Sequence, residues 1–313
     1  MQKASTTANA AGRLDKVLRA AFPAWGRRAV DELIKTKRVS VNGRGVWLAS
    51  WEVAVGDTLT VVNPPAERAA GPTAFDDAWL IHVDDHVVVV DKPAGLRAEA
   101  TRAEDLTPNL LGLCVEKFGD VTLAHRLDRD TSGIMVLARS ARARAVLDLA
   151  FKSHAMDKHY VAVVRPFVHG PGRGDEAPPN VPARGVIDLP IGPDPRRRDK
   201  MTVTNRDSKP ASTRYEIVSR RPERWYVHLW PSTGRTHQLR VHTSAMGMPI
   251  LGDRLYGDEA SAPRLMLHAA SLTLPAIGTR PSHTLHAPPP EGFVPGRRPK
   301  TLMKRAKRTG TAP

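Results

Sequence analysis

The chain has 313 residues, 41% of them hydrophobic and 25% charged, a composition typical of a globular protein with one large domain and a small accessory domain. Lys and Arg outnumber Asp and Glu by 47 to 32, a net charge of +15 that indicates a polyanionic partner, although it would also fit a basic surface kept for solubility. No apolar run approaches the ~20 residues that span a bilayer, and the N-terminus lacks the apolar segment of a signal peptide. We therefore expect a cytoplasmic protein that binds nucleic acid and no membrane.

The first part of the chain predicts a small basic module. Residues 1–12 are small and polar, and we expect them to be disordered. Apolar residues at helical spacing follow in residues 14–21 and 29–34, and alternating residues predict short strands near 39–41, 53–55 and 59–61. These elements form a module at residues 13–62. Its basic side chains form either a solvated face or a surface that contacts RNA phosphates. The candidate RNA-binding residues are Arg13, Lys16, Arg27, Arg28, Lys35, Lys37 and Arg38.

Residues 63–76 are rich in Pro and Ala and predict a linker, and residues 77–290 predict the large domain. Buried strands are expected at 86–93, 134–138, 160–164 and 225–230, helices at 141–151 and 236–246, and a further core segment at 265–274. Residues 169–184 predict a surface loop, and the basic residues 291–313 a disordered tail. The single cysteine, Cys114, lies in an apolar run and predicts a buried structural thiol.

A polar turn before one buried strand is the strongest candidate for chemistry. His125-Arg126-Leu127-Asp128-Arg129-Asp130-Thr131-Ser132-Gly133 leads directly into the apolar residues 134–138. A rigid strand can hold a reactive group that projects from such a turn. The same composition is also common in turns without any catalytic role. The histidines are scattered and no cluster of metal ligands occurs, so we expect no metal site.

The string HRLDRDTSG resembles the signature of the RluA-type pseudouridine synthases, which isomerise uridine to pseudouridine in RNA. The resemblance implies that Asp128 is the essential carboxylate. Further similar strings follow in order: DKPAGL at 91–96, KHYVAV at 158–163, GRTHQLRVH at 234–242, GMPILGD at 247–253 and RLMLHA at 264–269. The module at 13–62 resembles an RNA-binding module shared by a small-subunit ribosomal protein and many RNA-modifying enzymes. Together these segments cover about residues 13–290.

The resemblance implies an α+β fold: a large mixed, mostly antiparallel sheet with flanking helices, preceded by the small RNA-binding module. It implies Tyr160 and Arg240 as the other catalytic residues and no cofactor. An arginine paired with Asp128 would keep the carboxylate charged and fix its rotamer. Tyr160 could stack on the base or act as a general base. Candidate substrate-binding residues are His125, Arg126, Arg129, Arg235 and His237.

The reaction breaks the bond between uracil nitrogen and ribose and rejoins the base through carbon. Asp128 could attack the sugar or take a proton from it, and the sequence leaves both routes open. The uridine must first be flipped out of its RNA, at a cost of a few kcal/mol. Arg126 is a candidate to fill the vacated space or hold a phosphate, unless it forms a salt bridge instead.

The substrate is less well defined than the reaction. Residues 97–100 and 205–208 and the loop at 169–184 depart from the family pattern, which affects the choice of substrate. The small module and the departure at 97–100 favour ribosomal RNA, of the large subunit, over transfer RNA. Alternatives are a non-catalytic RNA-binding or ribosome-assembly protein, and a metal-dependent nuclease using Asp128 and Asp130. We expect a monomer.

Overall fold

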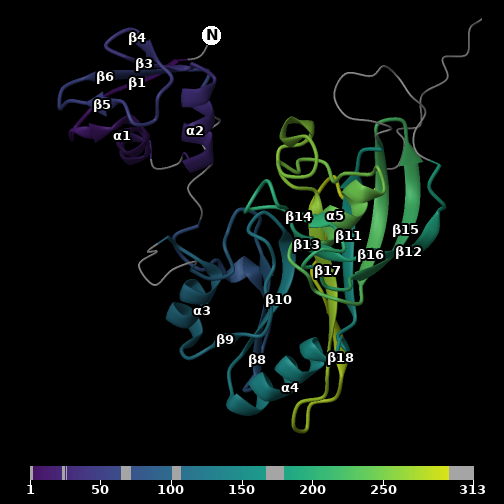
Figure 1. Ribbon diagram of the computed structural model, residues 1–313. Coiled ribbons are helices and arrows are strands. Elements are labelled where there is room, and N and C mark those ends of the chain that lie inside the picture. The colour runs from purple at the N-terminus through teal and green to yellow at the C-terminus, as the bar shows by residue number, and fades with distance from the viewer. Residues whose placement is uncertain are drawn as a thin grey trace, which may run out of the picture. The chain divides into compact units, whose positions relative to one another are not determined.

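A computed structural model describes residues 3–22, 25, 27–64, 72–100, 107–166 and 180–295. The chain divides into two compact units, Met1–Thr73 and Ala74–Pro313 (Figure 1). Parts of four predicted segments lie outside the described residues: 1–2 of the N-terminal segment, 65–71 of the linker, 169–179 of the loop and 296–313 of the tail.

The N-terminal unit has the helices and strands that its hydrophobic pattern predicts. A four-stranded antiparallel sheet has the order β1-β6-β3-β4, and β2 pairs with β5. The helices bury Leu14, Leu18 and Leu33 against Leu59 and Val61 of the sheet. The elements are β1 Lys3–Thr7, β2 Gly12–Arg13, α1 Leu14–Ala21, α2 Arg27–Lys35, β3 Val39–Val41, β4 Arg44–Val46, β5 Glu52–Val53 and β6 Thr58–Val62.

The prediction of disorder for residues 1–12 is wrong over most of that segment, because β1 adds a strand to this sheet. Lys3–Thr7 pairs along its whole length with Thr58–Val62, and the Ser5 hydroxyl lies 3.0 Å from that of Thr60. Ala8, directly after the strand, is buried. Small polar residues give no amphipathic signal in the sequence. Their backbone N–H and C=O groups nevertheless form hydrogen bonds with the backbone groups at the edge of β6.

The second unit is built on one large sheet. Its strands follow the order β12-β15-β16-β11-β17-β10-β8-β7, with β18 paired to β17 and β9 to β10. Among these pairs only β10 and β17 are parallel. The α+β fold with a mixed, mostly antiparallel sheet is therefore confirmed. The strands are β7 Leu80–Val83, β8 Val87–Lys92, β9 Thr122–Leu123, β10 Ser132–Ala138, β11 Lys158–Val164, β12 Arg184–Asp188, β15 Ser212–Arg221, β16 Arg224–Pro231, β17 Leu267–Leu274 and β18 His283–His286, with β13 Ile191–Pro193 and β14 Met201–Val203 forming a separate pair.

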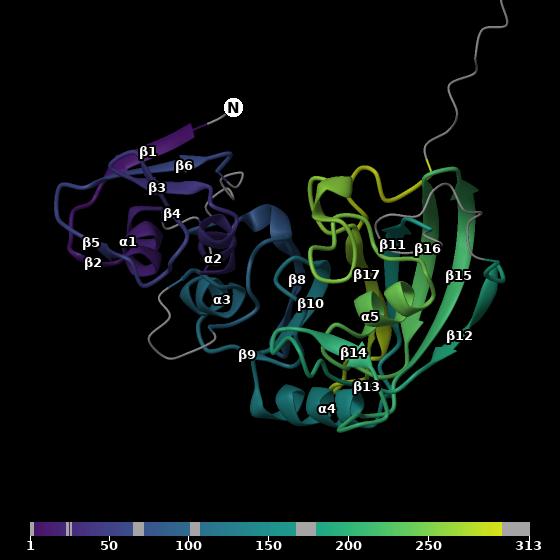
Figure 2. The same ribbon diagram turned by 45° about the horizontal axis from the view of Figure 1, so that its top comes forward.

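Helices cover the two halves of this sheet separately. The helix α4 packs against β10, and α5 lies against β14 and β16, as Figure 1 and Figure 2 both show. Every residue of β10 is buried. The helical elements are η1 Asp77–Trp79, α3 Leu110–Phe118, α4 Ala141–Lys152, α5 Gln238–Ala245 and η2 Glu259–Ser261. No helix among the described residues has the length and apolarity needed to cross a membrane.

The predicted structural thiol lies on α3. Cys114 is fully buried in the core beside the strands β8 and β10. Burial raises the pKa of this thiol to about 12, so the nucleophilic thiolate does not form near neutral pH.

The helix predicted at 236–246 begins later than expected, at Gln238. The Gln238 side chain accepts hydrogen bonds from the Thr233 hydroxyl at 2.7 Å and from the Arg235 backbone N–H at 3.0 Å. His237 has a left-handed backbone, with φ of 57°. Residues 233–237 therefore form a turn ahead of α5 and do not belong to the helix.

The parallel contact of β10 with β17 depends on a glycine. Gly133 faces Ala269 in register and has a φ of 116°, which side-chain-bearing residues rarely adopt. A Cβ atom at Gly133 would overlap the backbone carbonyl and amide of Ala269. The two strands therefore meet at this point only because residue 133 has no side chain.

We expect Gly133→Ala to lower the free energy of unfolding by about 3 kcal/mol, because it combines backbone strain with a clash. Urea unfolding followed by circular dichroism measures this. The control is Gly112→Ala in α3, where the new methyl group has ordinary contacts and the helix gains roughly 0.5–1 kcal/mol. Equal stabilities of the two variants would contradict the role of Gly133.

Candidate active site

Three segments that are distant in sequence line one cleft of about 960 Å³. They are the turn before β10, the strand β11, and the turn that leads into α5. The predicted catalytic residues Asp128, Tyr160 and Arg240 come from these three segments respectively, and all line the cleft. The convergence that the resemblance implied is therefore present in the fold.

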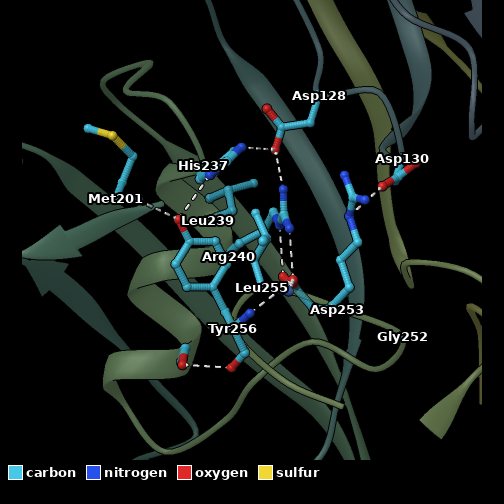
Figure 3. A network of polar contacts seen from close by, with 12 residues as sticks. Asp128, Asp130, Met201, His237, Leu239, Arg240, Gly252, Asp253, Leu255 and Tyr256 are labelled. Carbon is cyan, nitrogen blue, oxygen red and sulfur yellow. Dashed lines mark hydrogen bonds and ion pairs between the residues drawn. The ribbon is translucent and has the colours of Figure 1, made fainter. Parts of the chain in front are cut away.

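Asp128 and Arg240 form an ion pair at the floor of the cleft (Figure 3). The Arg240 Nη1 atom donates to Asp128 Oδ2 at 3.0 Å. The Arg240 side chain is only 5% exposed, whereas that of Asp128 is 27% exposed. Among the described residues no hydrogen bond engages Asp128 Oδ1. The carboxylate is thus fixed through one oxygen and open to the cleft at the other.

A second carboxylate holds the other edge of the guanidinium. Arg240 donates from Nε to Asp253 Oδ2 at 2.8 Å and from Nη2 to Asp253 Oδ1 at 2.7 Å. The Asp253 side chain is fully buried, and its Oδ1 also accepts from the backbone N–H groups of Leu255 and Tyr256. This bidentate pair fixes the plane of the guanidinium and hence the direction of Nη1 toward Asp128.

The charges of this pair are mutually stabilised. Burial alone would raise the pKa of Asp253, but its hydrogen bonds and its attraction to Arg240 hold that pKa below the usual carboxyl value. Burial likewise works to lower the pKa of Arg240, and the two carboxylates outweigh it, so the pKa lies above the ordinary guanidinium value. Asp253 was not among the residues predicted from sequence, although the string at 247–253 contains it.

His237 lies next to the ion pair. Its pKa is lowered, chiefly by burial. The Tyr256 hydroxyl accepts from the Met201 backbone N–H at 2.8 Å and forms a hydrogen bond with His237 Nδ1 at 2.9 Å. The other ring nitrogen, Nε2, lies 3.9 Å from Asp128 Oδ2. Tyr256, a second residue that the sequence prediction missed, thereby orients this imidazole.

Tyr160 lies half-buried on β11 and lines the cleft. Burial and the nearby negative charge of Asp128 raise the pKa of its phenol above the ordinary value of 10.0. A phenol with a raised pKa is a weaker proton acceptor near neutral pH. Of the two roles predicted for Tyr160, this environment favours stacking on the base over general-base catalysis.

The other predicted substrate-binding residues have divergent positions. His125 lines the cleft, but its Nε2 accepts from the Val136 backbone N–H at 3.1 Å and its ring stacks on Phe151 at 4.6 Å. Burial, with the positive charge of Lys158, lowers the pKa of His125 to about 3. The ring is thus a neutral support for β10.

Arg126 and Arg235 line the cleft near its opening. The Arg126 side chain is 69% exposed and forms an ion pair with Glu99 at 2.9 Å. Glu99 belongs to the segment at 97–100 that departs from the family pattern. Arg235 donates from Nε to the Pro210 carbonyl at 3.0 Å.

Arg129 does not line the cleft. Its Nε donates to the Gly95 carbonyl at 2.8 Å, and its own carbonyl accepts from Lys92 Nζ at 3.0 Å. The buried ammonium of Lys92 also donates to the carbonyls of Pro93 and Leu96, and burial lowers its pKa to about 7. These contacts connect the turn at 93–96 to the turn that carries Asp128. Arg129 therefore stabilises the turn of Asp128 without lining the cleft.

The basic candidates of the N-terminal unit lie mainly at its surface. Arg13, Lys16, Lys35 and Lys37 are exposed, and Arg38 is half-buried with its Nη1 on the Asn63 carbonyl. The side chains of Arg27 and Arg28 lie outside the described part of the structure. Exposed cations are what contact with phosphates requires. In the described parts of the chain, no group of three or more His, Cys, Asp or Glu side chains could hold a metal ion.

We expect Asp253→Asn to lower the free energy of unfolding by about 3–5 kcal/mol, because it leaves the buried edge of Arg240 without its anionic partner. Urea unfolding at pH 7 measures the change. Asp207→Asn is the matched control, since that side chain is 84% exposed and its substitution should stay within about 0.5 kcal/mol. A loss no larger than the control's would mean that Asp253 does not hold Arg240.

The neutral His125 ring predicts a pH dependence of stability. In the unfolded chain the ring takes up a proton near pH 6.5, whereas in the folded protein it stays neutral down to about pH 3. Stability therefore falls as the pH drops below 6.5, by at most about 1.4 kcal/mol per pH unit from this group. We expect a shallower fall between pH 7 and 4.5 in His125→Gln, measured by urea unfolding. His286→Gln, at an exposed ring, should follow the unsubstituted protein; identical slopes in all three would contradict a neutral His125.

Comparisons with known proteins identify the family of this chain. The sequence model of the RNA pseudouridylate synthases matches residues 86–245, and that of the S4 domain matches residues 12–59. The chain is 39% identical over 234 residues to the dual-specificity RNA pseudouridine synthase RluA of Escherichia coli K12, covering 72% of this chain and 96% of that protein. It is 33% identical over 253 residues to the uncharacterized RNA pseudouridine synthase YlyB of Bacillus subtilis, covering 78% and 79%. The solved structure of human RNA pseudouridylate synthase domain containing 1 matches with a TM-score of 0.55 and 27% identity, over 67% of this chain and 82% of that one. The chain therefore belongs to the RNA pseudouridylate synthase family, as an RNA pseudouridine synthase, an isomerase, with an N-terminal S4 domain.

Proposed function

We propose that this synthase isomerises uridines in large-subunit ribosomal RNA and that Asp128 is its essential carboxylate. The observation that carries the proposal is the ion pair at the floor of the cleft, where Arg240 Nη1 lies 3.0 Å from Asp128 Oδ2. The free oxygen of Asp128 faces a cleft of about 960 Å³, a volume in the range of small-molecule sites. A flipped-out nucleotide would therefore reach a fixed carboxylate.

Asp128 acts in one of two ways in this proposal. In the first, Oδ1 attacks the ribose carbon as the bond to uracil nitrogen breaks, and the ester bond so formed breaks when the base rejoins that ribose carbon. In the second, Asp128 takes a proton from the sugar as the bond to uracil nitrogen breaks and returns it after the base has rejoined. In both, the base turns and rejoins through carbon, the proton on that carbon leaves, and the uracil nitrogen gains a proton. Arg240 positions the carboxylate, and the His237 ring lies beside it, with Nε2 3.9 Å from the same oxygen.

Other cleft residues would bind the nucleotide. Tyr160 offers the face of its ring for stacking on the uracil, a role that its raised pKa leaves intact. Arg126 is exposed at the opening of the cleft and paired with Glu99. In this proposal it leaves that carboxylate and enters the space that the flipped base vacates. A surface ion pair contributes only about 0–1 kcal/mol, so RNA phosphates can displace Glu99 from Arg126.

The choice of RNA follows from two features of the chain. The S4 domain adds an exposed basic surface suited to a large structured RNA, and Glu99 places a carboxylate beside Arg126 in the segment that departs from the family pattern. We propose ribosomal RNA on these grounds. The name of the Escherichia coli relative, a dual-specificity synthase, makes transfer RNA the second substrate to test.

We expect the protein to convert uridine in unmodified ribosomal RNA and expect Asp128→Asn to lower the rate at least 10³-fold, because an amide can neither attack the sugar nor take its proton. Chemical mapping of pseudouridine in rRNA and tRNA transcripts measures both. Asp130→Asn is the matched control, because Asp130 lies in the same turn but pairs with Arg254 at 3.5 Å.

The outcomes separate the alternatives. Conversion of rRNA that survives in Asp128→Asn contradicts the catalytic assignment, and conversion of tRNA alone contradicts the substrate. Tight binding without conversion would identify an RNA-binding protein. Magnesium-dependent cleavage would identify a nuclease, for which the described residues offer no cluster of carboxylates.

A further inference from the structure

A second pocket borders the cleft, and part of its lining comes from the opposite face of the sheet. Successive residues of a strand point to opposite faces, so His159 faces away from the cleft that Tyr160 lines. The His159 ring stacks on Trp230 of the neighbouring strand β16, with ring centroids 5.0 Å apart. Trp230 lines a pocket of about 390 Å³, which we call the side pocket.

An arginine completes this stack. Arg214 on β15 faces Trp230 in register, and its guanidinium carbon lies 3.9 Å from the centre of the Trp230 ring. The Trp230 ring is therefore sandwiched between His159 and Arg214. Arg214 is an exposed residue. A guanidinium over an aromatic ring can stack under a base and donate to a phosphate at the same time.

The side pocket shares part of its lining with the catalytic cleft. His154, Lys158 and Pro231 line both. Lys158 stands at the border, where its Nζ donates to the Thr233 carbonyl at 3.2 Å. A strand that has one nucleotide in the cleft would pass Lys158 and reach the side pocket within the next few nucleotides.

The charges suit an RNA strand. Lys158 and Arg214 are cationic, and Asp157 is the one carboxylate among the described residues that line the side pocket. Burial, with the neighbouring His228, lowers the pKa of His159 to about 4, so this ring adds stacking area but no charge at pH 7. Aromatic rings combined with cations along a groove are the usual elements of single-strand binding.

We propose that the side pocket binds an unpaired nucleotide that neighbours the target uridine on the same RNA strand, through the guanidinium of Arg214 stacked on Trp230 and the ammonium of Lys158. The proposal rests on the proposed function, since the target uridine occupies the cleft at Asp128. It deepens that function, because the site would favour uridines followed or preceded by an unpaired residue.

The test uses the full chain and a labelled 12-nucleotide oligouridylate, with affinity measured by fluorescence anisotropy at several salt concentrations. We expect Arg214→Glu to weaken binding at least tenfold and to reduce the slope of log K against log[salt] by about 0.7. The same variant should raise KM for the RNA substrate and leave kcat nearly unchanged, because Arg214 lies outside the cleft.

Arg224→Glu is the matched control. It makes the same charge change on an exposed residue of the β15–β16 hairpin, six residues from Trp230 along β16, or about 20 Å. We expect its affinity to stay within twofold. Trp230→Leu, which keeps an apolar side chain but removes the ring under Arg214, should weaken binding in the same direction as Arg214→Glu.

Equal weakening in Arg214→Glu and Arg224→Glu would overturn the proposal, because the effect would then be one of net charge. Failure of the unsubstituted protein to bind the oligouridylate would overturn it too. The two proposals fail separately. Binding that depends on Arg214 without any conversion of RNA contradicts the proposed function alone, and Asp128-dependent conversion with normal binding by Arg214→Glu contradicts the side pocket alone.

Discussion

The site depends on one guanidinium that two carboxylates share. Arg240 is buried, and burial of an unpaired charge would cost several kcal/mol. Asp253 removes most of that cost by accepting two hydrogen bonds from the guanidinium, and the backbone amides of Leu255 and Tyr256 satisfy Asp253 in turn. Because Asp253 fixes the guanidinium through these two hydrogen bonds, a single direction is left for Nη1. Asp128 therefore receives a fixed partner without being buried itself.

The sheet supplies the rigidity that this arrangement needs. Gly133 lets β10 approach β17, directly after the turn that carries Asp128. Beside it, the Ser132 hydroxyl donates to His268 Nδ1 at 2.8 Å, and His268 Nε2 donates to the Ala287 carbonyl at 3.0 Å. Burial lowers the pKa of His268 to about 4, so the ring stays neutral and this tautomer persists. The turn is thus anchored from β17 as well as from Lys92 behind it.

Periodicity in the sequence predicted many of the strands and helices, because burial on one or both faces leaves a regular apolar pattern, but it did not predict β15 or α3. The resemblance supplied Asp128, Tyr160 and Arg240, which line one cleft. It gave no role to Asp253, because a carboxylate in a turn has no periodic signal and its partner is 13 residues away. The orientation of the Arg129 side chain could not be predicted from the sequence either. Adjacent arginines in a polar turn look alike, and only tertiary contacts turn Arg126 outward and Arg129 toward Gly95.

The alternation of β11 connects the two proposals physically. Tyr160 belongs to the cleft and His159 to the stack under the side pocket, so one strand holds both surfaces at a fixed separation. Substitutions at Arg214 would change which strand sequences and structures bind, while the ion pair of Asp128 with Arg240 stays on the other face of the sheet. Chemistry and substrate choice can then vary independently, because the residues that bind the flanking strand carry no part of the hydrogen-bond chain that positions the carboxylate.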